Sequence, residues 1–388
     1  MTRLGDVCEK IGSGATPRGG KEAYKDAGIP IIRSQNIHDW VFQPDGLAFL
    51  DDEQAESLSN VEVRSNDVLL NITGDSVARA CIVPSECIPA RVNQHVAIVR
   101  AGKEINPTYL LASLQSKKTM LLSLASSGAT RNALTKRMIE NLDIDLPSRE
   151  IQDSIAQVLD SIQYKITLNN RLNDYLEQLV DGKFQELFGG LNFNATLSDV
   201  AVITMGQSPA GSSYNEEGAG IIFYQGRGEF GWRFPKRRLY TTEPKRLACE
   251  GDVLMSVRAP VGDLNVAFEN CCIGRGLAAI HSETPSFALY LMRFLKPQLE
   301  AYNGEGTVFG SINGKALKSL EVALPSHNEV MQFESFAAPI DALIRSNENE
   351  TRKLNNLRNY LLPKLMSGEI DVSKVDLTQL TNNHLADC

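Results

Sequence analysis

The 388-residue sequence has few of the residues from which metal centres and disulfide frameworks are built. Its seven cysteines are an odd number without Cys-x-x-Cys spacing, and its five histidines are isolated from one another. Zinc sites that can be read from a sequence show closely spaced Cys and His ligands. We therefore expect neither a metal site nor disulfides, as in a protein of the reducing cytoplasm.

Long apolar runs are also missing. None reaches the roughly 18–20 residues of a membrane-spanning helix, and the N-terminal MTRLGDVCEK does not resemble a signal peptide. The hydrophobic share of 43% and the charged share of 22% are ordinary for a globular protein. The composition predicts about two cytoplasmic domains without membrane contact.

Catalytic motifs are missing as well. Residues 226–231 read GRGEFG and formally match a dinucleotide-binding loop, but WRFPKRRLY follows where that loop needs a helix. There is no HExxH, GxSxG or P-loop spacing, and no Asn/Asp-Pro-Pro-aromatic motif of an amino-methyltransferase. The sequence therefore predicts a binding protein without a catalytic centre.

The sequence also lacks an excess of positive charge. The net charge of −8 argues against a nucleic-acid binder when taken alone, because such proteins neutralise phosphates. The charge is uneven, however. Residues 227–246 hold seven Lys or Arg and two acids, whereas residues 34–63 hold no Lys or Arg. The basic stretch fits either a polyanion-binding face or an ordinary solvated one.

What the sequence does contain is a duplication. LDIDLPSREIQ at 142–152 returns as LEVALPSHNEVMQ at 320–332, and LGDVCEKIGSGATP at 4–17 returns as LSDVAVITMGQSP at 197–209. SNDVLLNITG at 65–74 matches EGDVLMSVRA at 250–259, so the order is kept. Each copy alternates short β-like runs with one helical stretch. This predicts two similar mixed α/β globules, at 1–148 and 191–326.

An amphipathic helical pattern of roughly 35 residues follows each Leu-Pro-Ser. The predicted helical regions are 149–190 and 327–372, with Ser148 and Ser326 as N-caps and a polar tail at 373–388. We expect the two helices to form an antiparallel coiled coil between the globules, in which two seam asparagines fix the register. Packing of each helix on its own globule is the alternative. The predicted seam comprises Ile155, Ile162, Asn169, Leu172, Leu176, Leu179, Ile340, Leu343, Asn347, Leu354, Leu357 and Leu361.

Together these features resemble the specificity (S, HsdS) subunit of Type I restriction–modification systems. The resemblance covers residues 1–372 and is carried by LGDV…GSGATP with LSDV…MGQSP, by NDVLL with GDVLM, by the two Leu-Pro-Ser junctions, and by LRNYLLPKLMSGEIDV. It implies an α+β fold with two target recognition domains, each reading half of a bipartite DNA site. The helices would set the gap and dock two modification (M) subunits, joined by restriction (R) subunits.

The resemblance also implies that this chain has no cofactor and no turnover. S-adenosylmethionine would bind the modification subunit, and ATP and Mg would bind the restriction subunit. The acidic stretch at 34–63 is awkward beside DNA, and we expect it to face solvent or a modification subunit.

Side chains that read base edges are mainly Arg, Lys, Asn and Gln. We expect DNA contacts in the divergent inserts and glycine-rich loops, made by a third to a half of the candidates. In the first domain these are Arg18, Gln35, Asn36, Arg79, Arg91, Asn93, Arg131 and Asn132. In the second they are Gln207, Arg227, Arg233, Lys236, Arg237, Arg238, Arg258, Arg275 and Asn313.

Two other functions stay open at this point. The chain could be a two-headed spacer whose globules bind proteins and have no DNA preference. It could also be a stand-alone methyltransferase or nuclease, against which the missing motifs speak. The sequence does not separate a restricting system from one that only methylates.

Overall fold

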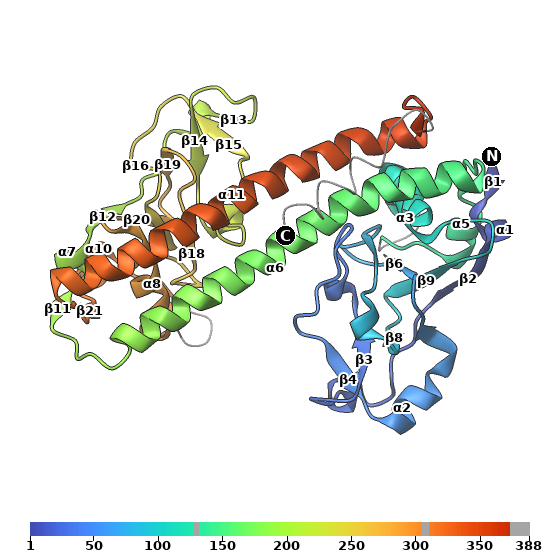
Figure 1. Ribbon diagram of the computed structural model, residues 1–388, viewed down its shortest axis with the longest axis horizontal. Helices are drawn as coiled ribbons and strands as arrows, with labels where there is room; N and C mark the ends of the chain where they lie inside the picture. The colour runs from blue at the N-terminus through green and yellow to red at the C-terminus, as the bar shows by residue number, and fades with distance from the viewer. Residues whose placement is uncertain (127–131, 305–309, 373–388) are drawn as a thin grey trace. The chain divides into compact units, whose positions relative to one another are not determined.

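The computed structural model describes residues 1–126, 132–304 and 310–372 (Figure 1). Its contacts divide the chain into two units. Unit 1 comprises residues 1–168 and the chain from 350 onward, and unit 2 comprises residues 169–349. Among the described residues, no helix is both long enough and apolar enough to cross a membrane.

Unit 1 is built on two four-stranded sheets. One is antiparallel in the order β2-β9-β6-β7, and the other has the order β4-β3-β8-β5 with a parallel β3–β8 pair. A short β1–β10 pair joins the two ends of the domain. The strands are β1 (Thr2–Arg3), β2 (Cys8–Ser13), β3 (Ile29–Ile32), β4 (Ala48–Leu50), β5 (Glu62–Val63), β6 (Val68–Asn71), β7 (Ala80–Ile82), β8 (Ala90–Val92), β9 (Val96–Ala101) and β10 (Asp143–Ile144). The helices are α1 (Leu4–Val7), α2 (Asp52–Ser57), α3 (Pro107–Ser116), α4 (Lys118–Ser126) and α5 (Lys136–Glu140).

Unit 2 repeats this plan. Its antiparallel sheet has the order β12-β20-β17-β18, its mixed sheet the order β13-β15-β14-β19-β16, and its end pair is β11–β21. The strands are β11 (Ala195–Thr196), β12 (Val202–Met205), β13 (Tyr214–Asn215), β14 (Ile221–Tyr224), β15 (Leu239–Thr241), β16 (Leu247–Ala248), β17 (Val253–Ser256), β18 (Leu264–Val266), β19 (Cys271–Ile273), β20 (Leu277–His281) and β21 (Glu321–Val322). The helices are α7 (Leu197–Val200), α8 (Pro285–Phe294), α9 (Lys296–Glu300) and α10 (Gly314–Lys318).

The two units match at the level of single backbone hydrogen bonds. Asn93 N donates to Ile32 O at 3.0 Å, and Gly274 N donates to Tyr224 O at 2.8 Å across the equivalent parallel pair. The central strands β6 and β17 are buried along their whole length, which explains why both read as unbroken apolar runs. The predicted duplication and the α+β class are confirmed.

Two 40-residue helices, α6 (Arg149–Phe188) and α11 (His327–Met366), contribute to both units. Ser326 caps α11 through a capping box: its hydroxyl accepts from Glu329 N at 3.4 Å, and Glu329 Oε2 accepts from Ser326 N at 2.9 Å. Each unit takes one half of each helix. The sequence predicts five parts, namely two globules, two helical regions and a tail, whereas the contacts give two units. The five-part division stays a prediction.

Within unit 1 the helix halves run antiparallel (Figure 1). Gln163 accepts from Arg358 at 2.6 Å, whereas Lys165, further along α6, pairs with Glu350, which is earlier in α11, at 3.3 Å. Ile155 and Leu362 also join the sheet core of the same unit. The helices thus pack both on each other and on the domain, which combines the two predicted alternatives.

Unit 2 shows the same double packing through aromatic rings. Phe184 of α6 lies 5.3 Å from Phe333 of α11 between ring centroids, and 5.7 Å from Phe287 of α8. Phe188 lies 5.6 Å from Phe287. One cluster therefore joins both helices to the domain core.

The predicted seam needs a correction in four places. Leu172, Leu179, Leu343 and Leu357 are exposed by 39%, 54%, 44% and 44%, respectively. In each case the next residue is buried: Asn173, Val180, Ile344 and Arg358. An α-helix has 3.6 residues per turn, so a seam counted at 3.5 drifts away from the buried face. Of the other seam residues, Ile155, Ile162, Asn169 and Asn347 are buried, and Leu176, Ile340, Leu354 and Leu361 are half-buried.

Candidate nucleic-acid interface

A polar hollow of about 480 Å³ lies on unit 1 where three loops meet. Its lining includes two of the predicted DNA contacts, Gln35 and Arg79, together with Thr73, Ser76, His95 and the carboxylate of Asp75. Arg79 makes no ion pair within the part of the chain that the structure describes. The loops therefore present an available cation beside several hydrogen-bonding groups.

Hydrogen bonds order the floor of this hollow. The Thr73 hydroxyl and His95 Nδ1 are 2.7 Å apart, and His95 N donates to the side-chain oxygen of Asn93 at 3.1 Å. Gly74 N donates to Asn132 O at 3.2 Å. Asn93 and Asn132 are thus brought to the same loops, with Asn93 buried and Asn132 exposed. Arg131 lies outside the described residues.

The corresponding loops of unit 2 carry other polar side chains. The backbone of Arg258 forms an isolated antiparallel β-bridge with Ser311, as the backbone of Thr73 does with Ala133 in unit 1. Gly274 is the counterpart of Asn93, and Arg275 follows it. Gln207 N donates to Ile273 O at 3.0 Å, and Arg275 N donates to Ser208 Oγ at 3.3 Å.

Gln207, Arg258 and Arg275 are all exposed, and neither arginine has an ion-pair partner among the described residues. The same edge of the repeated domain is therefore polar in both units, with different residues.

A tightly packed glycine precedes this edge in each unit. A Cβ on Gly14 would lie 2.1 Å from Val92 O, and one on Gly206 would lie 2.2 Å from Gly274 O. No other residue fits such a close approach between backbones. The glycines explain why GSGATP and MGQSP recur at this place. Arg18 is exposed on the segment that follows Gly14.

Three of the predicted contacts hold the protein together. Buried Asn36 accepts from Arg33 N at 3.0 Å and donates to Gln43 O at 2.9 Å. Buried Arg91 donates to Ala55 O at 2.9 Å. Asn313 caps α10 by accepting from Ala316 N at 2.9 Å. Their DNA roles stay predictions, but the structure gives each another function.

Four of the seven cations in the basic stretch 227–246 form ion pairs within unit 2. Arg227 pairs with Asp263, and Arg237 pairs with Glu269 at 2.6 Å. Arg238 pairs with Glu229 at 2.8 Å. Three others are exposed and have no ion pair among the described residues: Lys236, Lys245 and Arg246. The positive run in the sequence therefore corresponds to a surface of mixed charge.

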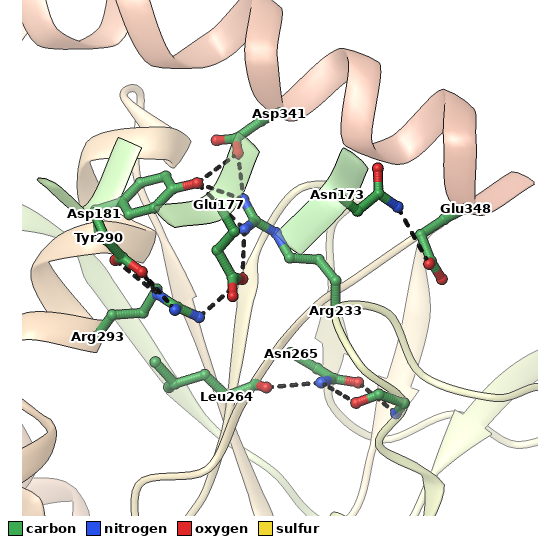
Figure 2. A network of polar contacts seen from close by, with 11 residues as sticks. Asn173, Glu177, Asp181, Arg233, Leu264, Asn265, Tyr290, Arg293, Asp341 and Glu348 are labelled. Carbon is green, nitrogen blue, oxygen red and sulfur yellow. Dashed lines mark hydrogen bonds and ion pairs between the residues drawn. The ribbon is translucent and has the colours of Figure 1, made fainter. Parts of the chain in front are cut away.

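Arg233 leaves this surface altogether and is 4% exposed (Figure 2). Its Nη1 donates to Glu177 of α6 at 3.0 Å, and its Nη2 pairs with Asp341 of α11. Both nitrogens also donate to the Tyr290 hydroxyl, at 3.3 and 3.2 Å. Burial disfavours the guanidinium charge, but Asp341 and the other partners outweigh it, so the pKa of Arg233 is raised.

Figure 2 shows a second arginine beside the first. Arg293 of α8 donates to Glu177 at 2.9 Å and forms a two-pronged pair with Asp181, at 2.9 and 2.6 Å. A hollow of about 940 Å³ opens next to this network and is lined by the glycine-rich loop that holds Arg227 and Trp232. The network fixes the insert of unit 2 to both helices.

Unit 1 makes the equivalent link with an aromatic ring. The guanidinium of Arg358 in α11 lies 5.2 Å from the ring centroid of Trp40, which belongs to the first insert and is 8% exposed. Trp40 thus packs inside the protein, whereas Trp232 is 43% exposed.

Sequence reasoning missed Thr73, Ser76 and His95 in the unit 1 hollow. His95 belongs to no recognisable sequence motif. Its spacing of two residues from Asn93 was the one available signal.

The family model of the Type I restriction modification DNA specificity domain matches residues 1–178 and 194–359. The chain belongs to this specificity family. The same domain is matched twice, once on each half of the duplication, and the two matches together include the loops described above.

Curated relatives extend along nearly the whole chain. One, named as the type I restriction enzyme MjaX specificity subunit of Methanocaldococcus jannaschii, is 29% identical over 96% of this chain and 93% of its own length. The MjaIX specificity subunit of the same organism is 21% identical over 97% of this chain and 94% of its own length. The solved S subunit from M. genitalium is 14% identical over 94% of this chain and 95% of that one, with a TM-score of 0.60, and shares the fold.

Proposed function

We propose that this chain is the DNA-specificity subunit of a Type I restriction–modification complex, with each domain reading one half of a bipartite site. One observation carries the proposal: the specificity-domain model matches both halves, and equivalent loops of the halves present different polar side chains. A repeated scaffold with unlike loops suits the reading of two unlike sequences.

The loop side chains have the chemistry of direct readout. Arg donates two hydrogen bonds to guanine, whereas Gln donates one to adenine N7 and accepts one from adenine N6. Gln35 and Arg79 offer these groups in unit 1, as Gln207, Arg258 and Arg275 do in unit 2. Phosphate contacts would come from the same arginines and from backbone N–H groups.

In this proposal the chain carries out no reaction step. Two modification subunits dock on the helices and supply S-adenosylmethionine chemistry, and restriction subunits add ATP- and Mg-dependent steps. Large exposed apolar side chains on the helices support this docking. Tyr164, Tyr175 and Tyr360 are exposed by 66%, 62% and 62%.

The test is the adenine methylome of a methylation-free host that expresses this chain with its modification subunit. We expect a bipartite motif, two short specified halves around a fixed gap. Exchange of residues 1–148 for those of a relative should change one half only. An active modification subunit without such a motif would favour the protein-spacer alternative.

A further inference from the structure

Three potential metal ligands meet in unit 2 at the edge of the antiparallel sheet. Cys249 and Asp252 lie in the turn between β16 and β17, and His281 ends β20. One ligand atom of each lies within 4.8 Å of those of the other two. The Asp252 side chain is 6% exposed, whereas His281 is 54% exposed and Cys249 also reaches solvent.

The carboxylate of Asp252 organises this cluster. Its Oδ2 accepts from Cys249 N at 2.8 Å, and its Oδ1 lies 2.6 Å from His281 Nδ1. The adjacent Glu250 pairs with Arg345 of α11 at 2.6 Å. The turn that carries Cys249 is therefore held both to β20 and to a long helix.

Unit 1 provides an internal comparison for this place. Asp67 takes the same position, because its Oδ2 accepts from Arg64 N at 2.7 Å and its own N donates to Arg64 O at 3.1 Å. Asp252 N donates to Cys249 O at the same 3.1 Å. By strand register, Arg64, Asp67 and Arg100 correspond to Cys249, Asp252 and His281.

The two copies compensate the buried carboxylate differently. In unit 1, Arg100 donates to both oxygens of Asp67 at 2.7 Å. Lys10 lies opposite Arg100 on the neighbouring strand and adds a second positive charge. In unit 2 the Lys10 position is Val202, which faces His281. Both arginine positions are occupied in unit 2 by residue types that can bind metals.

Among the described residues, Asp252 has no ion pair other than that with His281. A buried carboxylate is costly without a compensating charge. The second copy therefore lacks the permanent cations that the first copy has around its carboxylate.

We propose that Cys249, Asp252 and His281 bind Zn²⁺ or another thiophilic divalent cation, which replaces the arginine of unit 1 as the counter-charge. Thiolate, imidazole and carboxylate are all zinc ligands, at about 2.0–2.3 Å from the metal. Two ligands of one ion are thus at most about 4.6 Å apart, and small side-chain rotations bring the cluster within this limit. The exposed side of the site leaves a fourth position for water.

The ion would tie the β16–β17 turn to β20 and stabilise unit 2. This site rests on geometry and charge alone and is independent of DNA reading. Sequence reasoning missed it because the ligands lie 3 and 29 residues apart, without a local motif.

The experiment measures zinc bound to the purified full chain after dialysis against trace metal. We expect one equivalent in the wild-type chain and in Cys87→Ala, which removes a half-buried thiol of unit 1. In metal sites, loss of a residue that only hydrogen-bonds to a metal ligand already weakens metal binding about 10–100-fold. Cys249→Ala and His281→Gln should weaken binding at least as much. With Co²⁺, a thiolate charge-transfer band should appear in wild type and be absent in Cys249→Ala.

Equal zinc binding in wild type and in both variants would place the metal elsewhere and overturn the site. So would a folded wild-type chain, checked by circular dichroism, that retains no zinc at neutral pH. His281→Gln changes an exposed side chain, so it serves if Cys249→Ala does not fold. The triple change Lys10→Val, Arg64→Cys and Arg100→His should add a second equivalent, in unit 1.

Discussion

Arg233 belongs by sequence to a basic stretch, yet it is the most deeply buried cation of that stretch. A guanidinium between two carboxylates from two helices fixes the insert of unit 2 in place. Its function is therefore to position the domain, whichever residues touch DNA.

Replacing this arginine should be costly to unit 2. Arg233→Met leaves Glu177 and Asp341 without their common partner, and breaking a buried ion pair costs about 3–5 kcal/mol. Denaturant unfolding followed by a probe in unit 2 measures this loss. Arg237→Met is the matched control, since its exposed pair with Glu269 should contribute no more than about 1 kcal/mol. Equal effects of the two changes would contradict a positioning role for Arg233.

The polar hollow of unit 1 leads to a prediction on DNA binding. Arg79→Ala in the complex with the modification subunit should cost about 1–3 kcal/mol of binding if Arg79 reads a base, and should relax one position of the site. If Arg79 contacts a phosphate instead, binding to all DNA sequences should weaken alike. The slope of log K against log salt concentration should then fall by about 0.9.

Titration of labelled DNA at several salt concentrations separates the two outcomes for Arg79. Lys25→Ala is the control, because Lys25 is exposed and pairs with Asp51 at 3.5 Å. Unchanged affinity of Arg79→Ala for every sequence would remove this hollow from the interface.

At the scale of elements, α11 holds α8 of unit 2 by a side chain at the helix start. Glu334 accepts from Ser286 N at 3.2 Å and from Phe287 N at 2.8 Å. Burial raises the pKa of Glu334 above its ordinary 4.5, although the backbone hydrogen bonds oppose this rise. The exposed Glu329, by contrast, has a pKa lowered by its hydrogen bonds to Ser326.

The contributions of the two glutamates to stability should therefore depend on pH in opposite directions. The contribution of Glu334 is fully present below pH 4.5 and is lost as the pH rises through its raised pKa. That of Glu329 is present above 4.5 and is lost as the pH falls through its lowered pKa. In unfolding free energies measured against pH, Glu334→Gln should remove a decline above pH 4.5, and Glu329→Gln should remove a decline below it. The same change of slope in both variants would refute the assignment.

At the scale of the whole molecule, α6 and α11 are common to both units. If the helices set the DNA gap, lengthening both should lengthen it. A heptad inserted after Leu168 and another before Glu350 adds about 10 Å to each helix, which is about three base pairs at 3.4 Å per pair. The methylome should show the same two half-sites with a gap wider by about three. A heptad in α6 alone is the control and should abolish methylation, because the helix faces lose their register. An unchanged gap in the double insertion would argue against helices as the ruler.

The sequence alone determined the duplication, the two helices and the family. These depend on local signals: alternation of apolar residues, the Leu-Pro-Ser junctions and the repeated segments GSGATP and MGQSP. Such signals survive in a single chain because each depends on residues that are close together.

Only the tertiary structure decided which cations are available and which are paired. Arg233 and Arg91 look like Arg258 in the sequence, but the first two are buried with their own partners and the third is exposed. The phase of the helix seam and the meeting of Cys249, Asp252 and His281 were decided in the same way. Charge pairing and burial depend on residues far apart in the chain, and no local pattern encodes where the fold brings them together.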